Sequence, residues 1–184
     1  MRPLDLIRGL SGKPSHPPLT DASIGAYTVG VAMLVAGKVG LQDRQMAYGS
    51  LIAISGGLLL AAPTAVTGLV DWLGLEPGSP RRTVATAHLI AMVTATLLFA
   101  GTWLAQRPGY VHGKVETLGL ALGIAAEVVL TLGGYIGGTL VFAYGVRVVG
   151  RRDARPADAL IPGRLDRATT DADPDRPQGR TYGG

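Results

Sequence analysis

Residues 117–146 read TLGLALGIAAEVVLTLGGYIGGTLVFAYGV and contain a single charged side chain, Glu127. The hydrocarbon core of a bilayer is about 30 Å thick, and an α-helix needs about 20 apolar residues to cross it. Three more stretches meet that length, at residues 22–41, 47–73 and 83–105. The sequence therefore predicts an all-α integral membrane protein, an up-down bundle of four transmembrane helices.

The composition agrees with a membrane protein and excludes several kinds of chemistry. Of the 184 residues, 47% are hydrophobic and 16% are charged, and the mean hydropathy is +0.30. The chain has no cysteine, which excludes thiolate catalysis and cysteine-ligated iron–sulfur centres. The net charge of +4 does not indicate nucleic-acid binding, because the basic residues flank the apolar stretches. We expect a protein that is not an enzyme.

The apolar stretches divide the chain into three parts. Residues 1–19 form a basic, Pro-rich segment, and residues 20–150 hold the four transmembrane helices. Residues 151–184 are rich in Asp, Arg, Pro and Gly, and we expect this tail to be disordered. We detect no internal repeat.

Prolines and glycines predict where the helices begin, bend and end. Because Pro17 and Pro18 interrupt a helix, the first helix should begin at Thr20 or Asp21. Pro63 predicts a kink in the second helix, with neighbouring hydroxyl groups bonding the freed carbonyl groups. Turns are predicted at residues 42–46, 74–80 and 107–113.

Basic residues near the ends of the apolar stretches predict the orientation of the chain. On the side of the two chain ends lie Arg2, Arg8, Lys13, Arg81, Arg82, Arg147, Arg151, Arg152 and Arg155. On the opposite side lie Lys38, Arg44, Arg107 and Lys114. Because cytoplasmic loops are enriched in Lys and Arg, we expect both termini in the cytoplasm, and the protein in a bacterial inner membrane.

Glycines of the fourth stretch recur at a spacing of four residues. The pairs are Gly119 and Gly123, Gly133 and Gly137, and Gly134 and Gly138. Small residues at this spacing let two helix backbones approach closely in a membrane. The pattern predicts helix packing inside the bundle, or a seam with a second copy or with another membrane subunit.

Polar residues gather at one end of the predicted bundle. The expected cluster comprises His16, Asp21, Asp71, Arg81, Arg82 and His88. Ionisable groups at membrane depth are costly, and therefore mark candidate sites. The cluster suits a bound metal, a proton relay or a haem, but the two aspartates can also cap helix ends and pair with Arg81, Arg82 or His88.

The histidine count limits a haem to one arrangement. A bis-histidine b-type haem needs two imidazoles that face each other at matching depth. The third histidine, His112, belongs to the opposite end, so His16 and His88 are the only pair. Against this hypothesis, His16 lies in the Pro-rich entry segment rather than on a predicted helix.

Glu127 is a second candidate site, because it lies close to the middle of the fourth stretch. Thr94, Thr96 and Thr131 are its expected hydrogen-bond partners. A carboxyl group at this depth can belong to a path for protons or small solutes, or it can be a structural group that is held by hydrogen bonds.

Several motifs resemble those of an uncharacterised bacterial membrane family, domain of unknown function 2231. They are GKPSHP at residues 12–17, PTAVTGL at 63–69, DW at 71–72, His88, and GGYIGG at 133–138. The resemblance covers residues 12–148. Two positions depart from the family pattern, because Lys13 and Thr139 stand where similar proteins often have histidine.

The resemblance implies that the protein is associated with membrane redox chemistry, since some similar proteins carry a Rieske-type iron–sulfur domain after the fourth span. We therefore expect an accessory or anchor subunit of a membrane electron-transfer assembly. Its expected partners are the lipid bilayer and other membrane subunits or a second copy. The alternatives are a b-type cytochrome that uses His16 and His88, and a proton path through Glu127.

Overall fold

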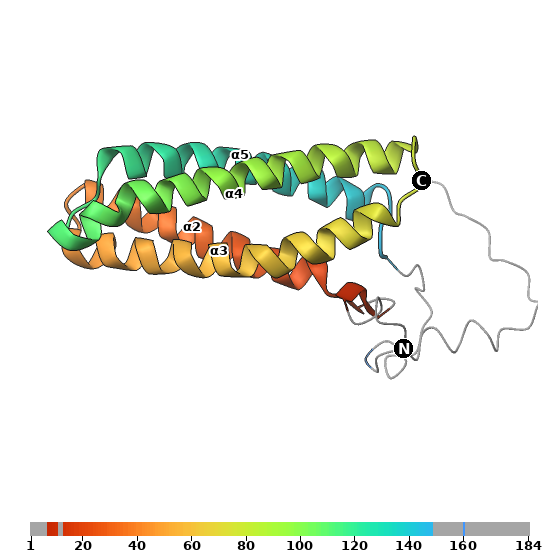
Figure 1. Cartoon of the computed structure of the whole chain (residues 1–184), viewed down its shortest axis with the longest axis horizontal. Helices are drawn as coiled ribbons and strands as arrows, with labels where there is room; N and C mark the ends of the chain where they lie inside the picture. The colour runs from red at the N-terminus through yellow and green to blue at the C-terminus, as the bar shows by residue number, and fades with distance from the viewer. Residues whose placement is uncertain (1–6, 11–12, 149–159, 161–184) are drawn as a thin grey trace, which may run out of the picture.

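The computed structural model describes residues 7–10, 13–148 and 160. Its elements are β1 (Gly9–Leu10), β2 (Lys13–Pro14), α2 (His16–Lys38), α3 (Asp43–Leu73), α4 (Pro80–His112) and α5 (Thr117–Phe142). The two short strands pair antiparallel, ahead of a bundle whose helices run alternately up and down (Figure 1). The expected all-helical bundle is confirmed in these parts of the chain. The predicted tail, apart from residue 160, lies outside them.

The outer surface of the bundle is apolar. Each of the four helices is long and apolar enough to cross a membrane. Large side chains point away from the bundle, including Ile52 (68% exposed), Leu59 (76%) and Leu132 (58%). A protein that faces water rarely exposes so many large apolar groups together, whereas lipid accommodates them.

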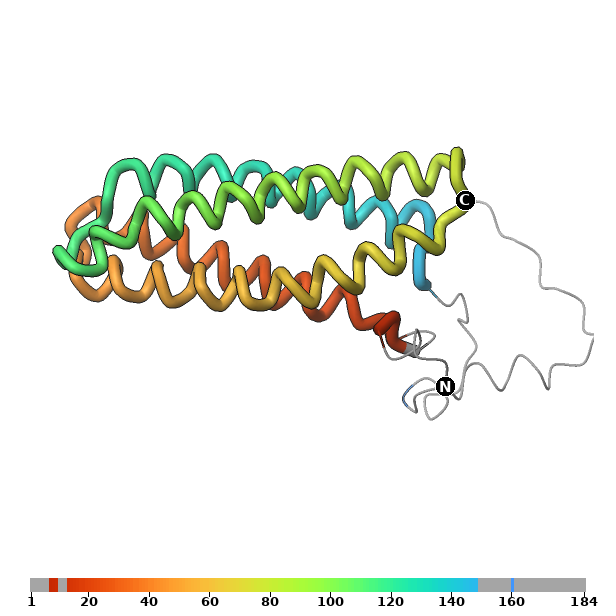
Figure 2. The backbone as a smooth tube through the Cα atoms, in the orientation of Figure 1, coloured from red at the N-terminus to blue at the C-terminus, as the bar shows by residue number. Residues whose placement is uncertain are grey.

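The helices form two hairpins that lie side by side. α2 packs mainly on α3, and α4 packs mainly on α5, while α3 also contacts α4 and α2 contacts α5 (Figure 2). As a result α2 and α4 occupy diagonally opposite corners, as do α3 and α5. The start of α2 and the end of α5 lie at the same end of the bundle.

The middle of the bundle is held by a pair of stacked aromatic rings. Tyr27 of α2 and Phe99 of α4 lie 3.9 Å apart between ring centroids, with an angle of 4° between their planes. Both are fully buried, next to Ile54 and Leu130. Gly57 of α3 makes room for them, because a Cβ atom there would lie 2.6 Å from the Tyr27 ring.

The predicted start of the first helix is wrong. α2 begins at His16, and Pro17 and Pro18 occupy its first turn. The first N–H groups of a helix have no partner within it, so proline loses nothing there. Thr20 is therefore not an N-cap, and its hydroxyl donates instead to the His16 carbonyl at 2.9 Å.

The last turn is also shorter than predicted, whereas the one at residues 74–80 is confirmed. α4 continues through Pro108 to His112, so the turn contains only residues 113–116. The fully buried Gln106 closes it. Its side-chain oxygen accepts from the Glu116 N–H at 3.0 Å, and its nitrogen donates to the Lys114 carbonyl at 3.2 Å.

Three of the α5 glycines pack inside the bundle. A Cβ atom would lie 3.0 Å from Gln106 at Gly119, 3.1 Å from Leu34 at Gly123 and 2.9 Å from Met92 at Gly133. These three glycines therefore allow close packing against neighbouring helices of the same chain.

The packing of the stacked rings against α3 can be tested with two adjacent glycines of that helix. We expect Gly57→Ala to destabilise the protein by about 1–3 kcal/mol, because the added methyl group must displace the Tyr27 ring. Gly56→Ala is the matched control, since no described side chain beyond its chain neighbours lies within 4 Å of a Cβ there. Unfolding of the purified protein in detergent measures both, and equal stabilities would contradict the assigned packing.

Candidate functional site

A cavity of about 680 Å³ lies between the two hairpins, towards the end where α2 begins and α5 ends. This volume is within the range of about 300–1,000 Å³ that is usual for pockets of cofactors and small ligands. His16 lines it from α2 and His88 from α4. The helices at the other two corners contribute several small lining residues: Ala61, Ala62, Ala65 and Gly68 on α3, and Gly134, Gly137 and Gly138 on α5.

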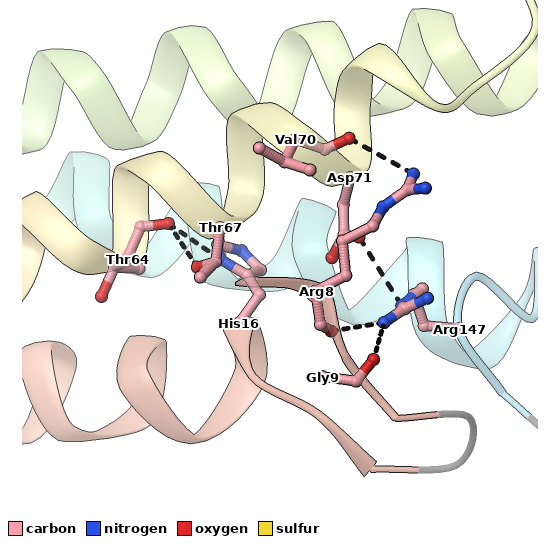
Figure 3. A network of polar contacts seen from close by, with 8 residues as sticks. All are labelled: Arg8, Gly9, His16, Thr64, Thr67, Val70, Asp71 and Arg147. Atoms are coloured by element: carbon pink, nitrogen blue, oxygen red, sulfur yellow. Dashed lines mark hydrogen bonds and ion pairs between the residues drawn. The ribbon is translucent and has the colours of Figure 1, made fainter. Parts of the chain in front are cut away.

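His16 is fixed by the backbone of α3 (Figure 3). Its Nδ1 lies 3.0 Å from the Thr64 carbonyl oxygen and 3.2 Å from the Thr67 hydroxyl. One turn further along α3, Gly68 allows the imidazole to lie against the helix, because a Cβ atom there would be 2.7 Å from His16 Cε1. The residue that begins α2 is thus held by its neighbour helix.

His88 is fixed in the same way by α5. Its Nδ1 lies 2.8 Å from the Gly133 carbonyl oxygen. Gly137 follows one turn later, and a Cβ atom there would lie 2.8 Å from His88 Cε1. The two hairpins therefore have the same arrangement. The first helix carries a histidine, and the second helix provides the carbonyl group that the imidazole bonds and a glycine four residues later.

These hydrogen bonds define the chemistry of both imidazoles. A carbonyl oxygen only accepts, so Nδ1 must carry the proton in each ring. In the neutral imidazole, Nε2 then keeps its lone pair for a ligand. Thr20 lies 3.4 Å from the Nε2 of His16, and within the described residues no hydrogen bond is made to the Nε2 of His88.

The two imidazoles both line the cavity and lie close to each other. Their ring centroids lie 6.4 Å apart and their planes are nearly perpendicular, at 87°. An imidazole nitrogen lies about 2 Å from a metal ion that it binds and about 1 Å from its own ring centre, so two imidazoles on opposite sides of one ion have centroids about 6 Å apart. The observed separation matches that arrangement.

A cluster of two arginines and one aspartate lies at the end of the cavity nearest the chain ends (Figure 3). Asp71 of α3 lies 3.3 Å from Arg8 Nε and 3.6 Å from Arg147 Nε. Arg147 also donates to the carbonyl groups of Arg8 and Gly9. We call Arg8, Asp71 and Arg147 the arginine clasp. It joins the segment before α2 and the segment after α5 to the end of α3.

The predicted pairing of Asp71 with Arg81, Arg82 or His88 is therefore wrong. Arg82 turns to its own loop, where it donates to the Leu75 carbonyl at 2.7 Å and lies 4.0 Å from the Trp72 ring. Arg81 is exposed. Asp21 is exposed as well, but it does line the cavity. The structure thus brings His16, His88, Asp71 and Asp21 to one cavity, and leaves Arg81 and Arg82 outside it.

Glu127 lies apart from this site. Its carboxylate accepts a hydrogen bond of 2.7 Å from Thr28 of α2, and its second oxygen is buried without a partner among the described residues. Of the expected partners, Thr94 and Thr96 are wrong, because they donate to the carbonyl groups of Ile90 and Met92. Thr131 does bond Glu127, but it donates to the backbone carbonyl at 2.9 Å rather than to the carboxylate. Neither Glu127 nor Thr28 lines the cavity.

Two features of the site escaped the sequence analysis. The first is the pair of hydrogen-bond acceptors for the histidines, which are backbone carbonyl groups of α3 and α5. The sequence signalled them only by a glycine four residues after each of these positions. The second is the role of Arg8 and Arg147. The sequence analysis used both arginines only to predict the orientation of the chain in the membrane. Nothing in their local sequence connects them to Asp71, which is 63 residues from Arg8.

The comparisons place the chain in a family. A family model described as "Predicted membrane protein (DUF2231)" matches residues 12–150. The chain belongs to the DUF2231 family. Within this DUF2231 region lie both histidines of the cavity, as well as Asp71 and Arg147, and neither Lys13 nor Thr139 lines the cavity. No curated protein and no solved structure gives a significant match to the chain.

The arginine clasp predicts energetic coupling between Asp71 and Arg147. In a double-mutant cycle with Asp71→Asn and Arg147→Gln, we expect a coupling of about 1–3 kcal/mol, since the contact joins partly buried charges. Arg81→Gln is the matched control, and should combine with Asp71→Asn additively to within about 0.5 kcal/mol. Unfolding in detergent gives both values. Coupling to Arg81 instead would restore the pairing that the sequence suggested.

Proposed function

We propose that the protein binds one b-type haem between His16 and His88 and serves as a small electron-transfer subunit in a membrane assembly. The observation that carries this proposal is the pair of imidazoles, each fixed through Nδ1, at a centroid separation of 6.4 Å in the lining of one cavity. A haem-ligating histidine is oriented in this way by a backbone acceptor on its other nitrogen.

The number of ligands favours haem over a bare metal ion. Zinc and similar ions usually take three or four protein ligands. Within the described residues, no group of three or more His, Cys, Asp or Glu is placed to hold a metal ion. A haem iron receives four nitrogens from its own macrocycle and needs only two side chains, which His16 and His88 supply.

The walls of the cavity suit a flat apolar ring. Because the histidines come from diagonally opposite helices, a ring held between them needs room beside the other two helices. There α3 and α5 carry Ala and Gly, and in the described part of the chain no side chain other than those of its neighbours lies within 4 Å of a Cβ at Gly134. Bulky side chains at these positions would occupy the space that the ring requires.

A bound haem would supply one-electron redox chemistry, while the chain binds it and keeps water away. Apolar residues such as Leu58, Met92 and Leu97 line the cavity alongside the small ones. We place the cavity end that holds the arginine clasp on the cytoplasmic side of a bacterial inner membrane, because that end carries most of the basic residues. The partner would be another membrane redox subunit or a second copy.

The two alternatives from the sequence are weaker. A purely structural anchor would account for the Nδ1 bonds of the two histidines, but it would leave the Nε2 of His88 without a partner among the described residues. A proton path through Glu127 would need polar groups in series, whereas Glu127 is bonded to Thr28 at the seam of α2 and α5 and does not line the cavity.

Removal of either histidine tests the proposal. Purified in mild detergent, the wild type should show the Soret band of a low-spin haem at one haem per chain. We expect His16→Ala and His88→Ala each to lose this band, because one axial ligand disappears. His112→Ala is the matched control, since His112 lies at the opposite end beside Glu116. A wild type that stays colourless after reconstitution with haem b would overturn the proposal.

The glycines behind the imidazoles give a second test that leaves both ligands in place. Gly68→Ala and Gly137→Ala put a methyl group within 2.7 Å and 2.8 Å of the His16 and His88 rings, so each imidazole must shift. We expect haem affinity to fall about tenfold or more, as for other lost orienting contacts. Gly25→Ala is the control, because a Cβ atom there would meet no side chain of the described residues within 4 Å, apart from those of its chain neighbours. Titration of the apoprotein with haem b measures all three variants.

A further inference from the structure

Arg147 is held in an unusual backbone conformation at the edge of the cavity. Its φ of 62° lies in the left-handed region, which costs a residue other than glycine about 1–2 kcal/mol. Despite that cost, the chain turns here so that Arg147 lines the cavity, directly after Val146. A free-energy cost of this kind persists only where the surrounding contacts enforce it, and such positions cluster at binding sites.

The guanidinium of Arg147 has donor capacity left over. Its Nε is buried and has no hydrogen-bond partner among the described residues. The nearest carboxylate oxygen, on Asp71, is 3.6 Å away, longer than the roughly 2.7–2.9 Å of a charge-assisted hydrogen bond. This Nε is enclosed by the protein, so a ligand would meet Nη1 instead. Nη1 forms no hydrogen bond among the described residues, and the Arg147 side chain is 29% exposed, so its guanidinium can still donate to an anionic oxygen.

The charges around Arg147 permit such a ligand. Asp71 is shared between two guanidinium groups, those of Arg8 and Arg147, so the arginine clasp carries one positive charge in excess. Asp21 also lines the cavity, but within the described residues it forms no ion pair with either arginine. At the opposite, deep end of the cavity, the lining consists of groups such as Ile24, Tyr27 and Leu58.

We infer that Arg147 binds a carboxylate group of the cofactor, and thereby orients it. This inference rests on the proposed haem function. Haem b is an amphiphile with two propionates on one edge and apolar substituents on the other. Its carboxylates would lie at the arginine clasp and its apolar edge towards Tyr27. Arg147 is then a positioning residue, because His16 and His88 alone bind the iron.

An esterified cofactor separates this role from iron ligation. The two probes are haem b and its dimethyl ester, which keeps the macrocycle and iron but has no free carboxylate. We expect the wild-type apoprotein to bind haem b about tenfold to a hundredfold more tightly than the ester, the range of a hydrogen bond between charged groups. Arg147→Gln should lower the affinity for haem b by that factor and leave the affinity for the ester unchanged.

Two further variants make the result specific. Arg81→Gln, at an exposed arginine of the same end, should keep the full preference for haem b. Arg147→Lys retains the positive charge but lacks the planar guanidinium group. This variant should keep only part of the preference for haem b. If Arg147→Gln does not fold, the wild type and Arg147→Lys decide by themselves: an unreduced preference in Arg147→Lys overturns the inference.

The outcomes distinguish this inference from the function on which it rests. Equal affinities of the wild type for both probes would remove the role of Arg147 while leaving the histidine ligands intact. An equal loss for both probes in Arg147→Gln would show that Arg147 only supports the fold, and would overturn the inference as well. If the wild type binds neither probe, the proposed haem function itself fails.

Discussion

A polar side chain inside a membrane bundle must find its hydrogen bonds within the protein, because lipid offers none. Here each histidine meets that demand with a backbone carbonyl of the next helix, Thr64 for His16 and Gly133 for His88. The contact is possible only because Gly68 and Gly137 let the rings lie against the backbone. The two bonds fix the imidazoles and also hold each hairpin together, so the site and the packing of this end depend on the same contacts.

The sequence predicted much of the fold because apolar length is a local property. The four helices, and the turn before Pro80, follow directly from runs of residues and from Gly and Pro. Helix ends were less predictable. Pro17 and Pro18 are harmless in a first turn, and α4 continues to His112 through Pro108, beside the Gln106 that ties the following turn to it. These outcomes depend on which groups lack partners, which residue types alone do not reveal.

The site was predictable in its residues but not in its contacts. His16, His88 and Asp71 stood out as ionisable groups at one end, and they do meet at one cavity. The partners of Asp71 could not be read from the sequence, because Arg8 and Arg147 lie far away along the chain. The similarity of the two hairpins was equally hidden. Its shared element is a backbone carbonyl, which Thr64 and Gly133 supply despite their different side chains.

The cavity itself constrains what the protein can bind. Protein interiors are close-packed, so a space of about 680 Å³ is large enough to admit a ligand. Exposed residues such as Leu97 and Phe142 line this space, so lipid tails can reach it as well. Lipid tails would give no partner to the Nε2 of His88, which forms no hydrogen bond among the described residues. In the proposed function, a flat apolar ligand with a metal at its centre would bind that nitrogen, and the carboxylates on its edge would lie at the arginine clasp.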